Sequence, residues 1–206
     1  MKRSRAVSAR AATLLALALG AACGGRSAVP LASAAARPGY VPADVRFFSA
    51  MIPHHGQAVL IAGWASTHGA SDPVRRLAER IVVAQRDEIA TLQGWLRDHH
   101  EPVPDFNAAR PATDVMDEMQ PPGMLSANDL SQLDAARGTE FDRLFLTLMI
   151  RHHRGAVTMA DDLFATFGAA QDDFVFKLAS DLLSDQAVEI DRMQQLLAEL
   201  GGAPPA

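Results

Sequence analysis

Apolar residues recur at helical spacing in four long segments of this 206-residue chain. Helix-ending glycines at 168 and 201–202, and the Asp72-Pro73 pair at a helix start, mark boundaries between the segments. Ser126 and Asp129 have capping-box spacing and predict a further short helix. The pattern predicts an all-α fold with long helices over Asp44 to about Thr67, Asp72 to about His99, about Thr139 to Phe167, and about Gln171 to Leu200.

The two halves of the chain repeat each other. Met51-Ile-Pro-His54-His55 recurs 98 residues later as Met149-Ile-Arg-His152-His153. Asp44 matches Asp142 at the same offset, and a Gln-x-x-Glu-Ile motif follows each copy. Two helix pairs with short internal turns, at about 42–98 and 139–200, and a proline-rich linker over 99–138 predict a four-helix bundle with one long crossover. Their equivalence predicts a pseudo-two-fold axis between the halves.

The N-terminal 22 residues have the pattern of an export signal. Lys2, Arg3, Arg5 and Arg10 precede a short apolar run that ends at Cys23, the only cysteine. This predicts a lipoprotein lipidated at Cys23 and held at the extracytoplasmic face of the cell envelope, with plain secretion or a periplasmic location as the alternative. Residues 23–41 are rich in Ala, Gly, Ser and Pro and predict a flexible tether before the folded domain at 42–200.

Net charge excludes one class of partner. The formal charge is −5 and no basic stripe is present, which argues against nucleic acid. Removing the signal takes away four basic residues and no acidic ones, so the exported chain carries −9. Homo-oligomerisation stays open, because a monomeric bundle would already use the one apolar face of each helix.

Polar residues occupy the apolar stripes of all four long helices. On a wheel at about 100° per residue, Asp142, Met149 and His153 share one stripe, with His152 and Met159 beside it. The first helix repeats this with Asp44, Met51, His54 and His55. The second and fourth helices place Gln85 with Glu88, and Gln186 with Glu189, on their apolar faces. Buried polar groups need partners, and bundle interiors hold metals with side chains from facing helices.

Ligand chemistry narrows the metal. Imidazole binds copper, zinc, iron and nickel, whereas thioether sulfur favours Cu(I). Histidine with methionine and no free core cysteine favours copper, and Met116, Met119 and Met124 of the linker are further soft donors. The carboxylates favour iron, manganese or zinc, or else orient the imidazoles from behind. A purely structural network of His–Glu pairs is the alternative to any metal site.

These motifs resemble the bacterial domain-of-unknown-function family three hundred and five. The resemblance covers about residues 42 to 200 and rests on the following segments: Met51–His55 with Ala58, Gln85-x-x-Glu88-Ile89, Pro122–Met124, Phe141–Arg143, Met149–His153, Gly155–Val157, Met159-Ala160, and Gln186-x-x-Glu189-Ile190. It implies a ferritin-like four-helix bundle in exported proteins, some of them linked to copper binding and resistance. Ile61 departs from the methionine usual in the first copy.

The predicted site combines the wheel and the resemblance. The metal ligands expected are His54, His55, Met51, His152, His153, Met149 and Met159. The expected supporting groups or additional ligands are Asp44, Glu88, Asp142, Glu189, Gln85 and Gln186. Because Ile61 replaces a methionine, the second copy is expected to be the better soft-metal site.

Three functions are consistent with these sequence features. The first is an extracytoplasmic protein that sequesters or hands on copper, without enzymatic activity. The second is a ferritin-like redox enzyme with a dinuclear iron or manganese centre, although the long helices have no Glu-x-x-His motif. The third is a structural or interaction module whose buried His–Glu pairs fix helix register. No catalytic triad, phosphate-binding loop or zinc-protease motif occurs in the sequence.

Overall fold

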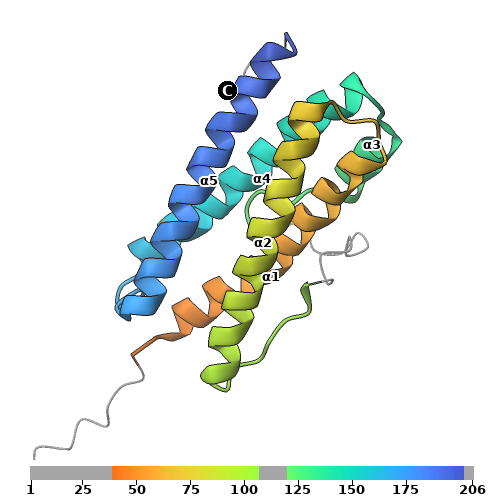
Figure 1. Ribbon diagram of the computed structural model, residues 1–206. Helices are drawn as coiled ribbons and strands as arrows, with labels where there is room; N and C mark the ends of the chain where they lie inside the picture. The colour runs from red at the N-terminus through yellow and green to blue at the C-terminus, as the bar shows by residue number, and fades with distance from the viewer. Residues whose placement is uncertain (1–38, 107–119, 202–206) are drawn as a thin grey trace, which may run out of the picture. The chain divides into compact units, whose positions relative to one another are not determined.

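The computed structural model describes residues 39–106 and 120–201, and every regular element in them is a helix (Figure 1). All of these residues belong to one unit of the chain. The predicted all-α class is confirmed. The predicted export signal, Cys23, Met116 and Met119 lie outside the described residues. The helices are α1 (Pro42–Gly63), the short 3₁₀ helix η1 (Trp64–Ser66), α2 (Asp72–Asp98), α3 (Ala127–Ala135), α4 (Thr139–Ala165) and α5 (Asp173–Glu199).

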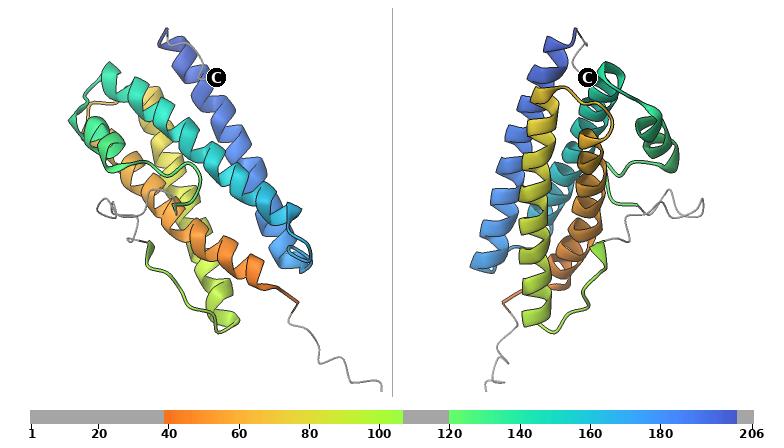
Figure 2. Two further views of the ribbon diagram at one scale, coloured as in Figure 1. Left: turned by 180° about the vertical axis from the view of Figure 1, so that it is seen from behind. Right: turned by 45° about the vertical axis from the view of Figure 1, so that its right-hand side comes forward.

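The long helices form two antiparallel hairpins. Helix α2 packs along α1, α5 packs along α4, and the hairpins meet through α1 and α4 (Figure 2). Helix α3 rests on α4 at the end of the crossover. The helices begin and end within a few residues of the predicted positions. The largest difference is at α1, which ends at Gly63, four residues before the predicted Thr67, and is followed by η1. Helix α4 ends at Ala165, so Phe167 lies in the turn and is fully exposed.

Local sequence accounts for these helix ends. The side chain of Ser126 accepts a hydrogen bond from Asp129 N–H (3.1 Å), and Asp129 Oδ2 accepts one from Ser126 N–H (2.9 Å), which completes the predicted capping box of α3. Asp172 caps α5 by accepting from the N–H groups of Phe174 and Val175. The α5 start therefore falls two residues later than predicted.

Two aspartates join the hairpins reciprocally. The Ala170 N–H in the α4–α5 turn donates to Asp44 Oδ1 at the start of α1 (2.8 Å). The Ser71 N–H in the α1–α2 turn donates to both oxygens of Asp142 at the start of α4 (3.2 Å each). Each hairpin thus supplies a carboxylate to the turn of the other, as the predicted pseudo-two-fold relation requires.

The apolar core is divided into two clusters. One gathers around Phe141, Phe145 and Ile81, and the other around Phe48, Trp95 and Leu182. On each long helix, with Val59 of α1 as the exception, the residues of one cluster precede and those of the other follow a short buried polar stretch. The fold therefore encloses one polar layer between two apolar ones.

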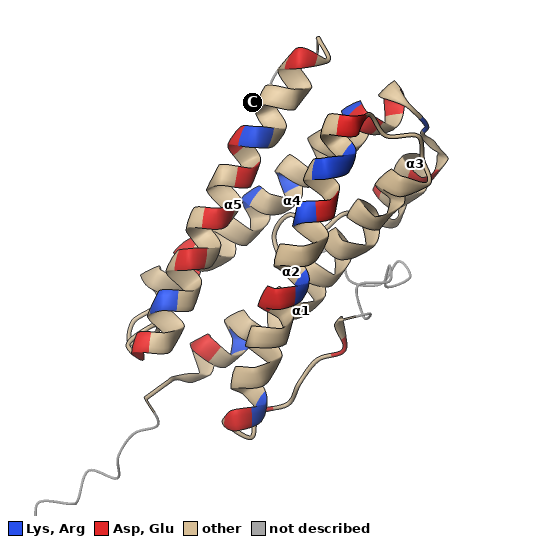
Figure 3. Cartoon of the chain, in the orientation of Figure 1, with Lys and Arg blue, Asp and Glu red and all other residues tan. Residues whose placement is uncertain are grey.

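Charged residues lie along the outward sides of the helices (Figure 3). Acidic residues outnumber basic ones on α5, and no basic stripe forms over the part of the chain that the structure describes. No helix within residues 39–106 and 120–201 is long and apolar enough to cross a bilayer.

Candidate metal centre

Four histidines form the middle of the polar layer. His54 and His55 lie halfway along α1, and His152 and His153 lie halfway along α4. Each is at most 1% exposed. Neighbouring positions on a helix point about 100° apart, so one histidine of each pair faces the partner hairpin and the other faces its own outer helix.

The outer pair, His55 and His153, faces glutamates. His55 Nε2 lies 2.8 Å from Glu88 Oε2 of α2, and His153 Nε2 lies 2.7 Å from Glu189 Oε2 of α5. The second contact has the angles of a hydrogen bond, whereas the first does not. Both glutamates keep a small exposed fraction, so the pairs run from the interior to the surface.

The inner pair, His54 and His152, lies between the hairpins. Their ring centroids are 3.8 Å apart with the planes tilted by 34°. His54 Nε2 lies 3.0 Å from the carbonyl oxygen of Pro122 in the crossover. Because a carbonyl can only accept, His54 carries its proton on Nε2 and keeps a lone pair on Nδ1.

Unsatisfied polar atoms are confined to this layer. Within the described residues, nine buried side-chain nitrogen and oxygen atoms lack a hydrogen-bond partner, and six of them are imidazole nitrogens. Such atoms are costly in a folded protein and call for an explanation at each site. All nine belong to residues that the sequence predicts for the site: His54, His55, Gln85, Glu88, His152, His153 and Gln186.

Burial keeps His54, His55 and His152 neutral. It lowers the pKa of His54 and His55 to about 3, with neighbouring histidines adding to the effect. The pKa of His152 falls well below its ordinary value, first through burial and then through His54. At neutral pH these side chains are uncharged and offer lone pairs, which is the form that binds a metal.

Two carboxyl groups on the outer side have raised pKa values. Burial, followed by the charge of Glu189, raises the pKa of Glu88 to about 7. Burial also raises the pKa of Asp185, and Glu88 is the next cause. These three side chains line a groove of about 500 Å³ between α2 and α5. Arg80 and Arg192 line the same groove, so α2 and α5 share a charged edge beside the outer histidines.

The arrangement of partners resembles that of metal-ligating histidines. Such residues donate one ring N–H to a carboxylate or backbone carbonyl, which fixes the other nitrogen as the ligand. Here Nε2 of His54 faces a carbonyl and Nε2 of His153 faces a carboxylate. In each ring, Nδ1 is therefore the nitrogen with a lone pair available to a metal. In His152 both ring nitrogens lack a partner among the described residues.

The crossover closes one side of the layer, and the sequence did not indicate this. Gln57 of α1 makes two hydrogen bonds with the backbone of Leu125: its Nε2 donates to the carbonyl (3.1 Å), and its Oε1 accepts from the N–H (2.8 Å). At Gly155 of α4, a Cβ atom would lie 2.0 Å from the oxygen of Pro122. The only sequence signal was a glutamine inside the apolar stripe of α1.

The other predicted residues fall into two groups. Met159 lines a pocket beside the layer, whereas Met51 and Met149 are fully buried in opposite apolar clusters. The structure does not bring Asp44 and Asp142 to the imidazoles. Each lies ten residues from the first histidine of its helix, about 15 Å along the axis, and binds backbone N–H groups.

The histidines do not form a ready-made hard-metal cluster. No three His, Cys, Asp or Glu side chains in residues 39–106 and 120–201 are grouped so as to hold a metal ion. The donors come instead as pairs, with methionines on the same two helices. Pairs of imidazoles and thioethers suit a soft ion of low coordination number better than a hard ion.

A family model described as Domain of unknown function (DUF305) matches residues 44–197. The chain belongs to the DUF305 family. A DUF305 protein from Streptomyces coelicolor, described as a candidate secreted protein, has 28% identity and a TM-score of 0.67, covering 80% of this chain and 97% of its own. A DUF305 fragment from Deinococcus radiodurans has the same identity and TM-score, covering 79% and 99%. A comparison with curated proteins gives no match.

Structures of CopM are also similar to this DUF305 chain. CopM in its Cu(II)-bound form has 29% identity and a TM-score of 0.61, covering 76% of this chain and 96% of its own. Further structures show CopM with Cu(I) and with silver. The solved structures similar to this chain therefore include a protein that binds soft metal ions.

Proposed function

We propose that this DUF305 chain is an extracytoplasmic copper-binding protein that sequesters copper or hands it on. The observation that carries the proposal is that, among the described residues, every buried side-chain polar atom without a hydrogen bond lies in one histidine layer. A structural network would satisfy its own members, because a half-satisfied buried network costs more than an apolar core. A bound ion would satisfy the free lone pairs of the layer.

Copper fits the donors better than the other metals considered. The imidazoles lie in pairs, and Met159 adds a thioether on the same helix as His152 and His153. Soft sulfur ligands select Cu(I), and imidazole accepts both copper states. The similarity to CopM, which has been crystallised with Cu(I), Cu(II) and silver, supports the same choice.

Export accompanies this proposal. The basic start, the apolar run and Cys23 support an anchored lipoprotein, and the similarity to a candidate secreted protein supports export in general. We assign the two hairpins to a ferritin-like four-helix bundle, with the histidine layer at mid-height. Copper handling outside the cytoplasm is the role that suits this combination.

Competition titration tests the proposal. The exported form, stripped of metal, is titrated with Cu(I) against bicinchoninate and with Cu(II) against a chelator of known affinity. We expect stoichiometric copper, and at least a 100-fold loss of affinity in the His54→Ala/His152→Ala variant. His100→Asn is the matched control, because His100 is an exposed histidine with a positive φ that asparagine tolerates.

Two outcomes would refute the copper proposal. One is wild-type protein that binds no copper at stoichiometric concentration. The other is unchanged affinity in the double variant while its circular dichroism matches the wild type. If the double variant does not fold, the separate His54→Ala and His152→Ala variants give the same comparison with one imidazole of the inner pair left in place.

A dinuclear iron or manganese redox enzyme is the second candidate. The observation that favours it is the pair of His–Glu contacts, which draws one ligand from each of the four long helices. Dinuclear carboxylate sites use four glutamates, whereas this layer has two. Iron-dependent oxygen consumption by the purified protein, lost in Glu88→Gln/Glu189→Gln, would replace the copper proposal with this one.

A further inference from the structure

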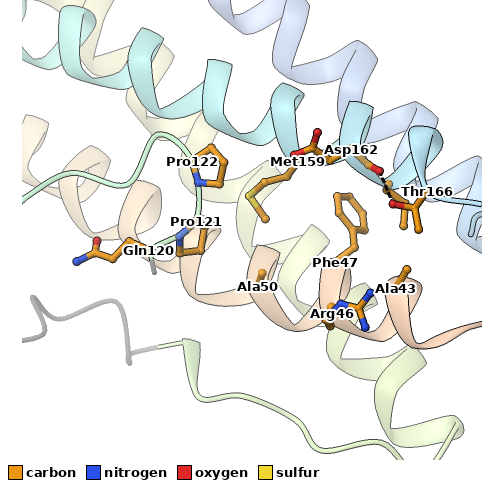
Figure 4. A pocket seen from close by; sticks show the side chains of 11 residues that line it. Ala43, Arg46, Phe47, Ala50, Gln120, Pro121, Pro122, Met159, Asp162 and Thr166 are labelled. Atoms are coloured by element: carbon orange, nitrogen blue, oxygen red, sulfur yellow. Dashed lines mark hydrogen bonds between the residues drawn. The ribbon is translucent and has the colours of Figure 1, made fainter. Parts of the chain in front are cut away.

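A pocket opens beside the inner histidines. It has a volume of about 320 Å³ and lies between α1, α4 and the end of the crossover (Figure 4). The apolar part of its lining comes from Phe47 and Ala50 of α1, Met159 and Leu163 of α4, and Pro122 of the crossover, and Arg46 and Asp162 line its outer part. A water molecule occupies about 30 Å³ of liquid, so the pocket has room for a metal ion with several waters.

The inner wall of the pocket is in direct contact with His54. Pro122 lines the pocket, and its carbonyl oxygen is the partner of His54 Nε2 at 3.0 Å. Ala50 precedes His54 by one helical turn on α1, about 6 Å along the axis. One residue of the crossover therefore separates the pocket from the inner histidine pair.

That wall is held mainly by reversible contacts. Leu125 is fixed by its two hydrogen bonds to Gln57, and Pro122 and Gly123 lie against the bare backbone of Gly155. None of these contacts belongs to the hydrogen bonding of a helix. Moving the segment 120–125 away from α1 and α4 breaks these contacts and withdraws the buried Leu125 side chain from the apolar core, but it unwinds neither helix.

The pocket also provides the right first ligand. Met159 is 8% exposed, and its side chain points into the pocket between Pro122 and Phe47 (Figure 4). A thioether binds Cu(I) and Ag(I) but has little affinity for hard ions. Met159 follows His152 by two helical turns, so an ion bound at the thioether would lie on the path from the pocket to the imidazole of His152.

A second route to the layer exists on the opposite side. The groove between α2 and α5 reaches Glu88 and Glu189, which contact the outer histidines. Its donors are carboxylates, which favour hard ions, and Ala84 lies on its wall. This groove is the direct competitor of the pocket as an entrance.

On the strength of the proposed copper function, we propose that the pocket at Met159 is the entry site for a soft monovalent ion. The ion is Cu(I) or Ag(I), which Met159 captures first. The segment 120–125 then moves, the Pro122 carbonyl leaves His54 Nε2, and the ion reaches the inner histidines. Gln57 sets how readily this segment moves, through its hold on Leu125.

Plugging each entrance with one substitution separates the two routes. Ala50→Phe fills the pocket and Ala84→Phe fills the groove; both alanines are partly exposed helix residues. Uptake is followed by stopped-flow loss of the coloured Cu(I)–bicinchoninate complex, and affinity by equilibrium titration with the same reagent. We expect Ala50→Phe to slow uptake at least tenfold with affinity changed less than threefold, and Ala84→Phe to leave the rate unchanged.

A third variant tests the moving segment. Gln57→Leu removes both hydrogen bonds to Leu125, so we expect faster Cu(I) uptake together with faster amide hydrogen exchange at Leu125. Unchanged uptake in Ala50→Phe, or slowing in Ala84→Phe alone, would overturn the entry site while leaving the copper function intact. Uptake no faster in Gln57→Leu, with Leu125 exchange increased, would overturn the role of the segment. Absence of copper binding in the equilibrium titration would refute the proposed function itself.

Discussion

Gly155 is the position where one methyl group conflicts most directly with the structure. Alanine there would place its Cβ 2.0 Å from the Pro122 oxygen, so the crossover must shift. Alanine favours helix by about 1 kcal/mol over glycine, but overpacking costs about 1–3 kcal/mol. We predict that Gly155→Ala lowers the free energy of unfolding by up to about 2 kcal/mol in urea denaturation.

Gly94 provides the control for this substitution. It lies inside α2, and an added Cβ meets nothing within 4 Å. Gly94→Ala is therefore expected to raise stability by up to about 1 kcal/mol. Equal effects at both glycines would contradict the close contact between the crossover and α4.

The buried histidines predict how the stability of metal-free protein depends on pH. Burial lowers the pKa of His54 and His55 to about 3 from 6.5, and that of His152 well below 6.5. On acidification the unfolded chain therefore binds three protons that the native state does not, and stability falls. Glu88 opposes this: its pKa is raised to about 7 from 4.5, so the native state takes up that proton first.

Between pH 6 and pH 5 the unfolded chain therefore binds about two more protons than the native state. We predict that the free energy of unfolding falls by about 3 kcal/mol per pH unit over this interval, measured by urea unfolding after chelator treatment. Stability that stays constant or rises over this interval would show that the imidazoles are not held neutral by burial.

Single residues differ in how far the sequence reveals them. The four histidines were predictable because each is a polar residue at an apolar position of a regular helix. The role of Gln57 was not, because its partner is the backbone of an irregular segment, which leaves no pattern of side chains to recognise. The same holds for the Pro122 carbonyl.

At the scale of elements, Asp44 and Asp142 join the two hairpins. Each accepts backbone N–H groups from the turn of the opposite hairpin. Removing such an acceptor leaves buried donors unpaired, which costs about 1–3 kcal/mol. We predict that Asp44→Ala and Asp142→Ala each destabilise the fold by this amount and leave copper stoichiometry and affinity unchanged.

The two aspartates can be compared with each other and with Asp98, the last residue of α2. Asp98→Ala changes a similar carboxylate at an exposed position and should have little effect. If the Asp44 or Asp142 variant lost copper affinity without unfolding, that aspartate would be a supporting group or ligand of the metal site, as the sequence pattern suggested. Thermal denaturation together with the copper titration gives both readings.

Helix positions were predictable for a clear reason. Long amphipathic segments bounded by Gly, Pro and capping residues carry their start and stop signals locally. A helical wheel gives the direction of a side chain about its own axis. It does not give the height at which two helices align, so Asp44 and the histidines shared a predicted stripe although about 15 Å separates them.

At the scale of the whole molecule, the layer lies where the two hairpins meet. An ion bound between His54 and His152 links α1 with α4, and so binds the native state but not the unfolded chain. At a free copper concentration 100 times the dissociation constant, this adds about 2.7 kcal/mol to stability. Calorimetry should show the melting temperature rising with copper, and this rise should be absent from His54→Ala/His152→Ala.

A rise of equal size in that variant would place the ion elsewhere in the chain.

The sequence indicated the repeat and the two hairpins, but not which helices meet. All four long helices carry a polar group inside an apolar face, so several pairings satisfied the same pattern. The aspartate–turn bonds between hairpins, which are long-range, select the pairing that the structure has.

The reciprocal aspartates also bear on the origin of the chain. Because each hairpin carries both a carboxylate for its partner's turn and a turn for its partner's carboxylate, a single hairpin is complementary to a copy of itself. Such a unit can assemble as a symmetric pair before any linker exists. Duplication and fusion would then add the crossover, which covers only one face of the pair. The crossover contacts Gln57 in the first half and Gly155 in the second half, and these two residues occupy equivalent positions of the repeat. An ancestral dimer would thereby have become a chain whose two halves were free to specialise.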